Sequence, residues 1–223
     1  MPKTGNIFLD FLSFASAFFP LIVLAFILIK KKYRNDALNF LMIICLLSFI
    51  RNLLVFIITL TTSTDNILSN IFSLIEFIFL IAIFKNYFPG KKIRNVLNII
   101  YAMFLSAVIS IYFSKGIEEK AFFIQFIFSL IAIIAGILCI VKITSSGNLN
   151  IFNDPVFWIA IGSLFYFSVL ILLQSIELFD KKINEDAIEK GLLLNIANIA
   201  RYFFYLLTVF FYEDPKNEEK NSF

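Results

Sequence analysis

Histidine is absent from the 223-residue sequence, and cysteine occurs only twice. Without an imidazole, the chain holds no Ser–His or Cys–His pair for nucleophilic catalysis, no histidine zinc motif and no histidine ligand for haem. Cys45 and Cys139 each lie inside an apolar run, which favours a buried packing role over a disulfide or a metal pair. We therefore expect no bound metal, no cofactor and no catalytic residues of these kinds.

Charged residues are also scarce, at 16% of the chain against about 25% in a typical soluble protein. The net charge of +3 is too small and too dispersed to indicate a nucleic-acid partner. In place of charge, 60% of the residues are hydrophobic, 30 of them Phe, and the mean hydropathy is +0.90. A soluble core of this size would leave large apolar patches exposed to water, so we expect lipid to surround most of the chain.

Seven apolar stretches follow one another, each close to the roughly 20 residues with which a helix crosses about 30 Å of hydrocarbon. We predict membrane spans at residues 7–29, 37–60, 67–84, 93–113, 122–141, 155–176 and 191–212. An isolated strand would leave its backbone polar groups unsatisfied in lipid, so the spans are predicted to be helices. The sequence therefore predicts an all-α, polytopic seven-transmembrane-helix bundle. It forms a single domain over residues 1–223 and ends in a short cytoplasmic tail at 213–223.

The distribution of Lys and Arg predicts the orientation of this bundle. Four basic residues lie in the segment 30–36 and four more in 85–94, whereas the segment 61–66 between these two has none. Basic residues are enriched in the cytoplasmic loops of membrane proteins. We therefore expect a multi-pass protein of the bacterial inner membrane, with its N-terminus outside and its C-terminus in the cytoplasm.

Three ionisable residues interrupt the predicted spans near mid-depth. They are Arg51 in the second span, Glu76 in the third and Arg201 in the seventh. A charge at the bilayer centre costs about 3 kcal/mol on insertion scales, so such a side chain faces protein or water rather than lipid. Because consecutive helices alternate in direction, the three residues reach similar depths, and we expect them to meet.

Other polar residues recur at helical spacing beside these three charges. Asn198, Arg201 and Tyr205 fall on one face of the seventh span, and Ser73 lies three residues before Glu76 in the third. The most economical arrangement buries these polar faces against one another. The candidate ligand-binding residues are Arg51, Asn52, Ser73, Glu76, Tyr166, Asn198, Arg201 and Tyr205.

Two interpretations of this cluster remain open. In the structural one, Glu76 pairs with one arginine and the other arginine pairs with Asp10 or with helix-end carbonyls, so that the network only locks the bundle. In the functional one, two arginines face a single carboxylate and leave net positive charge in a pocket. Such a pocket suits an anionic group, because a guanidinium binds carboxylate or phosphate through two parallel hydrogen bonds.

Three short motifs, together with the spacing of the spans, carry a resemblance to a known group of proteins. The motifs are S-L-I-E-F at Ser73–Phe77, F-W-I-A-I-G-S-L-F-Y at Phe157–Tyr166 and N-I-A-R-Y at Asn198–Tyr202. The chain resembles small seven-helix membrane proteins of Bacteroidota with no assigned function. That group is similar in layout to the membrane sensor modules that precede some bacterial histidine kinases. The resemblance implies a bundle that places Glu76, Tyr166 and Arg201 around a common site, and it brings no assigned activity with it.

Three functions are compatible with these observations. The leading hypothesis is a receptor-like or accessory signalling protein that binds a small anionic ligand or a membrane lipid. No output domain follows the seventh span in the sequence, so we expect the signal to pass to a separate membrane or cytoplasmic protein. The alternative is a small secondary transporter or channel in which Glu76 couples to a proton or cation. A lipid-modifying enzyme that uses Asp10 and Glu76 as an acid/base pair is the least expected, because the two carboxylates lie at different depths.

Overall fold

The computed structural model describes residues 7–59, 65–88, 90–115, 122–146, 150–179 and 187–212. The predicted cytoplasmic tail at 213–223 lies outside these residues. The described elements are α1 (Ile7–Ile29), η1 (Lys32–Arg34), α2 (Asp36–Thr59), α3 (Asp65–Tyr87), α4 (Lys91–Lys115), α5 (Phe122–Ser145), η2 (Ile151–Asn153), α6 (Pro155–Phe179) and α7 (Ala187–Phe211). Within the described residues there is no strand, and seven helices are long and apolar enough to cross a membrane. The predicted all-α seven-helix membrane fold is confirmed.

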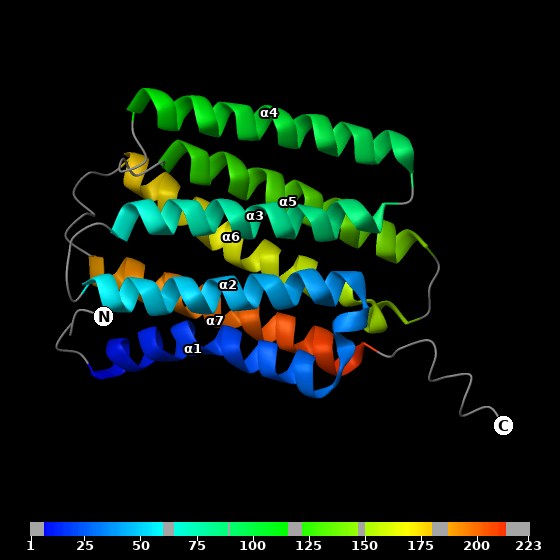
Figure 1. The fold of residues 1–223 in the computed structure, drawn as a ribbon, viewed down its shortest axis with the longest axis horizontal. Helices are drawn as coiled ribbons and strands as arrows, with labels where there is room; N and C mark the ends of the chain where they lie inside the picture. The colour runs from blue at the N-terminus through cyan, green and yellow to red at the C-terminus, as the bar shows by residue number, and fades with distance from the viewer. Residues whose placement is uncertain are drawn as a thin grey trace.

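Six of the helices form a closed ring, and the seventh lies outside it. Around the ring, α1 packs against α2, α2 against α3, α3 against α5, α5 against α6, α6 against α7, and α7 back against α1. The helices run side by side along the long axis, and α4 lies at the edge beyond α3 (Figure 1). On α4, Phe104 and Val108 pack inward, whereas Ile99 and Met103 are exposed on the outward side. The ring therefore provides the interior of the protein, and α4 borders it from outside.

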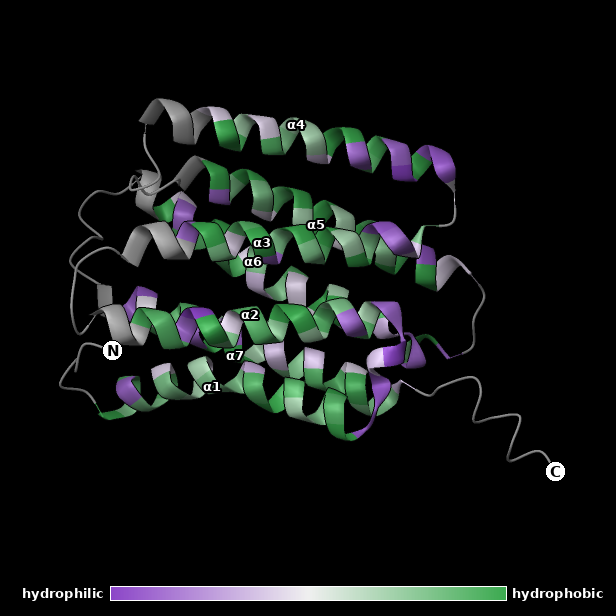
Figure 2. Cartoon of the chain, in the orientation of Figure 1, coloured by the Kyte–Doolittle hydropathy of each residue, from purple (hydrophilic) through white to green (hydrophobic). Residues whose placement is uncertain are grey.

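Basic residues gather at one end of the bundle, which is called here the basic end. Hydrophilic residues colour this end around η1 and the first turns of α4, while the helices between the ends are mostly hydrophobic (Figure 2). The described basic residues at this end are Lys30, Lys31, Lys32, Arg34, Lys85, Lys91, Lys92, Arg94 and Lys142. Asp154, at the same end, has a structural role. One of its carboxylate oxygens accepts a hydrogen bond from the Val156 backbone N–H at 2.8 Å and so caps α6. Burial raises the pKa of Asp154.

The half of the ring nearest the basic end, called here the packed half, is filled by side chains. Its buried residues include Val23, Ile27, Leu38, Leu41, Ile44, Cys45, Leu80, Ile83, Phe84, Ala135, Cys139, Ile159, Ala160, Tyr202, Tyr205 and Val209. Cys45 and Cys139 are both free and buried, which confirms the packing role predicted for them. Close packing of this kind leaves few voids among these described residues.

Glycine brings α6 and α7 unusually close at one point. A Cβ atom placed on Gly162 lies 2.9 Å from the Arg201 carbonyl oxygen and 2.9 Å from the Phe204 Cβ. Real Cβ atoms do not approach backbone this closely, so only glycine fits there. The contact sets α7, and with it Arg201, directly against α6.

Candidate functional site

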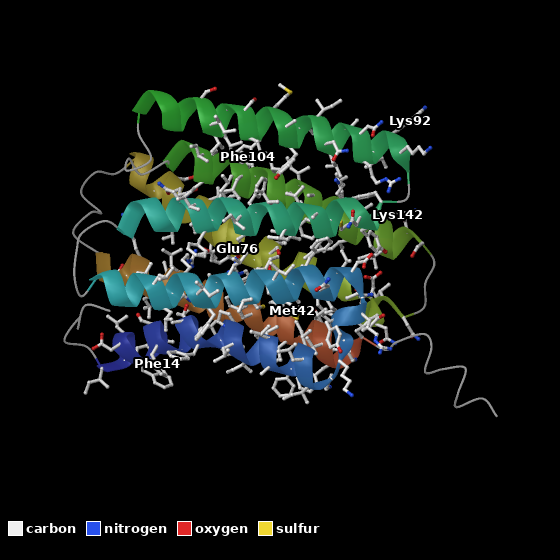
Figure 3. The ribbon with its side chains drawn as sticks, in the orientation of Figure 1. Phe14, Met42, Glu76, Lys92, Phe104 and Lys142 are labelled. Atoms are coloured by element: carbon white, nitrogen blue, oxygen red, sulfur yellow. The ribbon has the colours of Figure 1, made fainter. Side chains whose placement is uncertain are left out.

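A cavity of about 320 Å³ lies inside the ring, between α2, α3, α5, α6 and α7. This volume is at the small end of the roughly 300–1,000 Å³ typical of small-molecule sites. Its lining consists of Arg51, Asn52, Val55, Ser73, Glu76, Phe77, Gln125, Phe128, Tyr166, Phe167, Leu170, Leu194 and Arg201. Figure 3 shows Glu76 near the middle of the bundle, away from the basic end that Lys92 and Lys142 mark.

The cavity extends from mid-depth toward the end opposite the basic end. On α7 its lining runs from Leu194 to Arg201, which is about 10 Å along the axis at 1.5 Å per residue. Glu76, Tyr166 and Arg201 are the polar lining residues nearest the basic end, and they are called here the floor of the cavity. The packed half begins directly beyond this floor, so the cavity is closed toward the basic end.

An ion pair between α3 and α7 forms part of the floor. The Arg201 Nη1 donates to the Glu76 Oε1 at 2.5 Å, and the Ser48 hydroxyl lies 3.5 Å from the other carboxylate oxygen. The side chain of Arg201 is 2% exposed and that of Glu76 is 12% exposed. A buried ion pair is retained only when close geometry and further hydrogen bonds offset the loss of hydration. Here one such bond, from Arg201 Nη2 to the Tyr202 hydroxyl at 2.8 Å, provides part of that compensation.

Three tyrosine rings surround the same guanidinium. The Arg201 Cζ lies 4.2 Å from the ring centre of Tyr166, 4.7 Å from that of Tyr202 and 5.8 Å from that of Tyr205. A cation within about 6 Å of an aromatic face is attracted by the negative potential of the ring. Arg201 is therefore held both by a carboxylate and by aromatic faces, and its charge is largely accounted for inside the protein.

Arg51 is placed very differently. It lies on α2, is partly buried and lines the cavity, yet no described residue forms a hydrogen bond or ion pair with its guanidinium. The hydroxyls of Ser73 and Tyr166 also line the cavity without a hydrogen-bond partner among the described residues. The charged lining residues are Arg51, Arg201 and Glu76, so the site carries one net positive charge. The structure thus divides the two arginines into one that is paired and one that is open to the cavity.

Six of the eight candidate ligand-binding residues line the cavity together: Arg51, Asn52, Ser73, Glu76, Tyr166 and Arg201. Asn52 also has a second contact, because its Nδ2 donates to the Ala17 carbonyl of α1 at 3.3 Å. Arg51, Glu76 and Arg201, expected from their depths to meet, therefore border one space, although only Glu76 and Arg201 are in direct contact.

Asn198 and Tyr205 lie away from the cavity. Asn198 faces α1, where its Nδ2 lies 2.9 Å from the Ser16 hydroxyl and 3.5 Å from the Ser16 carbonyl. Pro20 has no N–H and leaves this carbonyl without its helical partner, so Asn198 supplies a donor that α1 lacks. Tyr205 shares a hydrogen bond of 2.9 Å with the Ser163 hydroxyl inside the packed half. Both residues belong to helix packing, and their position on the polar stripe of α7 did not distinguish this from a site.

Gln125 is a cavity residue that the sequence reasoning missed. It lines the cavity from α5, and its side-chain oxygen accepts a hydrogen bond from Gln174 of α6 at 3.3 Å. Like the other candidates it is a polar residue inside a predicted span, but it lies one turn from the start of the span rather than near mid-depth. The aromatic walls formed by Phe77, Phe128 and Phe167 carried no such signal, because 30 Phe residues are distributed throughout the chain.

Compared with models of known protein families, with curated proteins and with solved structures, the chain matches none of them. Among the residues that the structure describes, no group of three or more His, Cys, Asp and Glu side chains is placed to hold a metal ion. The geometry of the cavity therefore carries the functional argument. The cavity offers hydroxyl and amide groups, apolar walls and one guanidinium that is not paired with any described residue.

Proposed function

We propose that this chain is a receptor-like or accessory signalling protein of a bacterial inner membrane, which binds a small anionic ligand in the central cavity. The observation that carries the proposal is Arg51, which lines the cavity and whose guanidinium has no hydrogen-bond or ion-pair partner among the residues that the structure describes. A charge kept at depth in a membrane protein needs a counter-charge or water, and an intramembrane ionisable residue is by default a candidate functional residue. An anion in the cavity supplies the missing partner.

The one-sided shape of the cavity favours a receptor over an open channel. The packed half closes the bundle between the floor and the basic end. We place the N-terminus outside and the basic end in the cytoplasm, in keeping with the enrichment of Lys and Arg in cytoplasmic segments. In this orientation the ligand enters from outside and stops at Glu76, Tyr166 and Arg201.

Helix α7 provides a route from the cavity to the basic end. Arg201 forms part of the floor, and Gly162 holds this part of α7 tightly against α6. Farther along, the Tyr212 carbonyl accepts a hydrogen bond from the Lys32 ammonium group at the basic end. A ligand that binds two states of the bundle with different affinity shifts the population between them. A separate protein with an acidic surface would detect that shift at the basic end.

The test is crosslinking in native membranes, followed by purification in mild detergent and mass spectrometry of the bound proteins and small molecules. We expect an anionic molecule with the wild-type protein and its loss from Arg51→Gln. The matched control is Arg94→Gln, which makes the same substitution at the basic end and outside the cavity lining. An identical set of bound molecules in Arg51→Gln, or the absence of any crosslinked signalling protein, would contradict the proposal.

A secondary transporter is the second candidate, favoured by the carboxylate at the closed floor. Glu76 lies near mid-depth, and a cavity closed on one side matches one state of an alternating-access cycle. Transport requires a second state that is open toward the basic end. Uptake of solutes into proteoliposomes above that of empty liposomes, lost in Glu76→Gln, would favour transport over reception.

A further inference from the structure

We infer that the ligand is a monoanionic amphiphile, with a single negatively charged head group such as a carboxylate joined to a short apolar body, bound with its head toward the floor. This inference rests on the proposed anion-binding function and narrows it to a chemical class. Three separate properties of the cavity support it: its net charge, the type of its unpartnered polar groups and the arrangement of its walls.

The net charge indicates one negative charge on the ligand. Arg201 and Glu76 neutralise each other through their ion pair, which leaves the charge of Arg51 alone. In a low-dielectric interior, a charge without a counter-charge is costly. A monoanion brings the site to neutrality, whereas a dianion would bury one uncompensated negative charge and a neutral ligand would leave Arg51 unpaired.

Most of the polar lining groups without a partner among the described residues can donate hydrogen bonds. They include the Arg51 guanidinium, the buried Arg201 Nε and the hydroxyls of Ser73 and Tyr166, whereas the Asn52 side-chain oxygen is an acceptor. A carboxylate or phosphodiester accepts several hydrogen bonds and matches the flat guanidinium through two parallel ones. A cationic ligand would find only Glu76 as a negatively charged partner in the lining, and that carboxylate is already paired with Arg201.

The walls indicate an apolar body that points away from the floor. On α2, α6 and α7, the lining residues farthest from the basic end are the apolar Val55, Leu170 and Leu194, whereas on α3 and α5 they are Ser73 and Gln125. The aromatic side chains of Phe128 and Phe167 lie between these residues and the floor. Burying apolar surface against such walls stabilises a complex by about 25 cal/mol per Å². A small polar anion such as acetate gains none of this, so the walls select for an attached hydrocarbon group.

Two sources can supply this chemistry: a free medium-chain acid from outside, or the monoanionic head group of a membrane phospholipid. The test uses the full-length protein in nanodiscs of zwitterionic phosphatidylcholine, with isothermal titration calorimetry of octanoate, acetate, sulfate and octanol. We expect octanoate to bind more tightly than the other three. Each methylene that enters the cavity is expected to raise the affinity by up to about fourfold.

Single-residue variants test whether octanoate binds in the cavity. Arg51→Gln is expected to weaken octanoate binding by about tenfold or more, because a charge-assisted hydrogen bond is lost. Arg51→Lys keeps the charge and should retain part of the affinity, and Arg94→Gln should retain all of it. Leu194→Asn should reduce the preference for octanoate over acetate, because it makes an apolar part of the wall polar. These last variants also show whether a loss in Arg51→Gln reflects binding rather than folding.

The outcomes distinguish a failure of this inference from a failure of the proposed anion-binding function. One outcome is that sulfate or acetate binds as tightly as octanoate in the titration and that both anions lose binding in Arg51→Gln. That result would overturn the inference of an amphiphilic ligand and leave the proposed anion site intact. If no anion binds in a manner that depends on Arg51, both fail. In a second arm, phosphatidylglycerol replaces part of the phosphatidylcholine. Competition with octanoate assigns the site to a lipid head group, and its absence assigns the site to a free acid.

Discussion

A guanidinium in the middle of a membrane protein needs a partner, and the two arginines of this chain meet that need differently. Arg201 is surrounded by a carboxylate and three tyrosine rings and is almost completely buried. Arg51 faces the cavity without a described partner. The same residue type therefore forms an ion pair between two helices at one position and lines a cavity at the other. At the residue scale, this separates the structural interpretation of the charges from the functional one.

The ion pair between Arg201 and Glu76 predicts strong coupling between the two residues. Glu76→Gln should lower the free energy of unfolding by about 3–5 kcal/mol, because it leaves a buried charge uncompensated. The double variant Glu76→Gln with Arg201→Gln should cost less than the sum of the single variants. The measurement is a double-mutant cycle from SDS titration in mixed micelles. Strictly additive effects would show that the pair contributes no interaction energy.

At the scale of a single element, α1 contains a proline that leaves one backbone carbonyl without a helical hydrogen bond, and a side chain of another helix supplies a donor to it. Pro20 removes the donor that the Ser16 carbonyl would otherwise use, and Asn198 of α7 lies within hydrogen-bond distance of that carbonyl. The polar stripe of α7 thus has two purposes along its length: Arg201 faces the cavity, and Asn198 joins α7 to α1. A helix in lipid has no water to satisfy its backbone, so the donor has to come from protein.

Replacing Pro20 tests whether Asn198 compensates for the missing backbone donor. Asn198→Leu should lower the free energy of unfolding by about 1–3 kcal/mol, because buried polar groups of Ser16 lose their donor. Pro20→Ala restores a backbone donor to α1, so the double variant should lose less than the two single variants predict. Asn195→Leu is the control, since Asn195 donates to the Ser13 hydroxyl rather than to the carbonyl that Pro20 leaves open, and it should combine additively with Pro20→Ala. If the changes in unfolding free energy of Asn198→Leu and Pro20→Ala also add, Asn198 does not compensate for the missing donor.

The contact between α6 and α7 makes a second prediction at this scale. Gly162→Ala should destabilise the protein by about 1–3 kcal/mol, since the new methyl group meets the backbone of Arg201 and must push α7 away. Gly136→Ala is the matched control, because its nearest neighbour is the Leu164 side chain at 3.3 Å, which can shift. The same unfolding assay applies to both. Equal losses for the two glycines would show that the close approach at Gly162 is not limiting.

At the scale of the whole molecule, one half of the ring is packed and the other half holds the cavity. The packed half coincides with the basic end. A rigid half beside a hollow half allows a ligand to act on helix positions without opening a path through the bundle. This asymmetry supports our proposal of reception from outside, and it makes the orientation in the membrane the property to measure.

Thiol labelling measures that orientation. In a background in which Cys45 and Cys139 are replaced by Ala, Leu194→Cys should react with a membrane-impermeant maleimide added to intact spheroplasts. Leu194 lines the cavity at the end away from the basic end. Arg34→Cys at the basic end should react only after the membrane is permeabilised. The reverse pattern would show that the N-terminus is cytoplasmic and would contradict entry of the ligand from outside.

The sequence predicted where each helix lies with little error, and it predicted the site only in part. The first span was predicted to begin and end at the residues where α1 does, and the others differ mainly by added turns at their ends. Of the candidate residues, Arg51 and Glu76 line the cavity as expected, whereas Tyr205 does not. Helical periodicity identifies a polar face but not the neighbour that this face meets, which is why Tyr205 was grouped with the site.

By itself, the sequence determined that this chain is a seven-helix membrane bundle, that its charges at depth face inward, and that basic residues gather at one end. Each of these depends on local sums, because the length and hydropathy of a segment decide whether it enters lipid. Only the tertiary structure decided that α4 lies outside the ring, that Glu76 pairs with Arg201, and that Arg51 is left facing a cavity. These follow from the rotation and neighbours of each helix, which depend on close packing between distant segments.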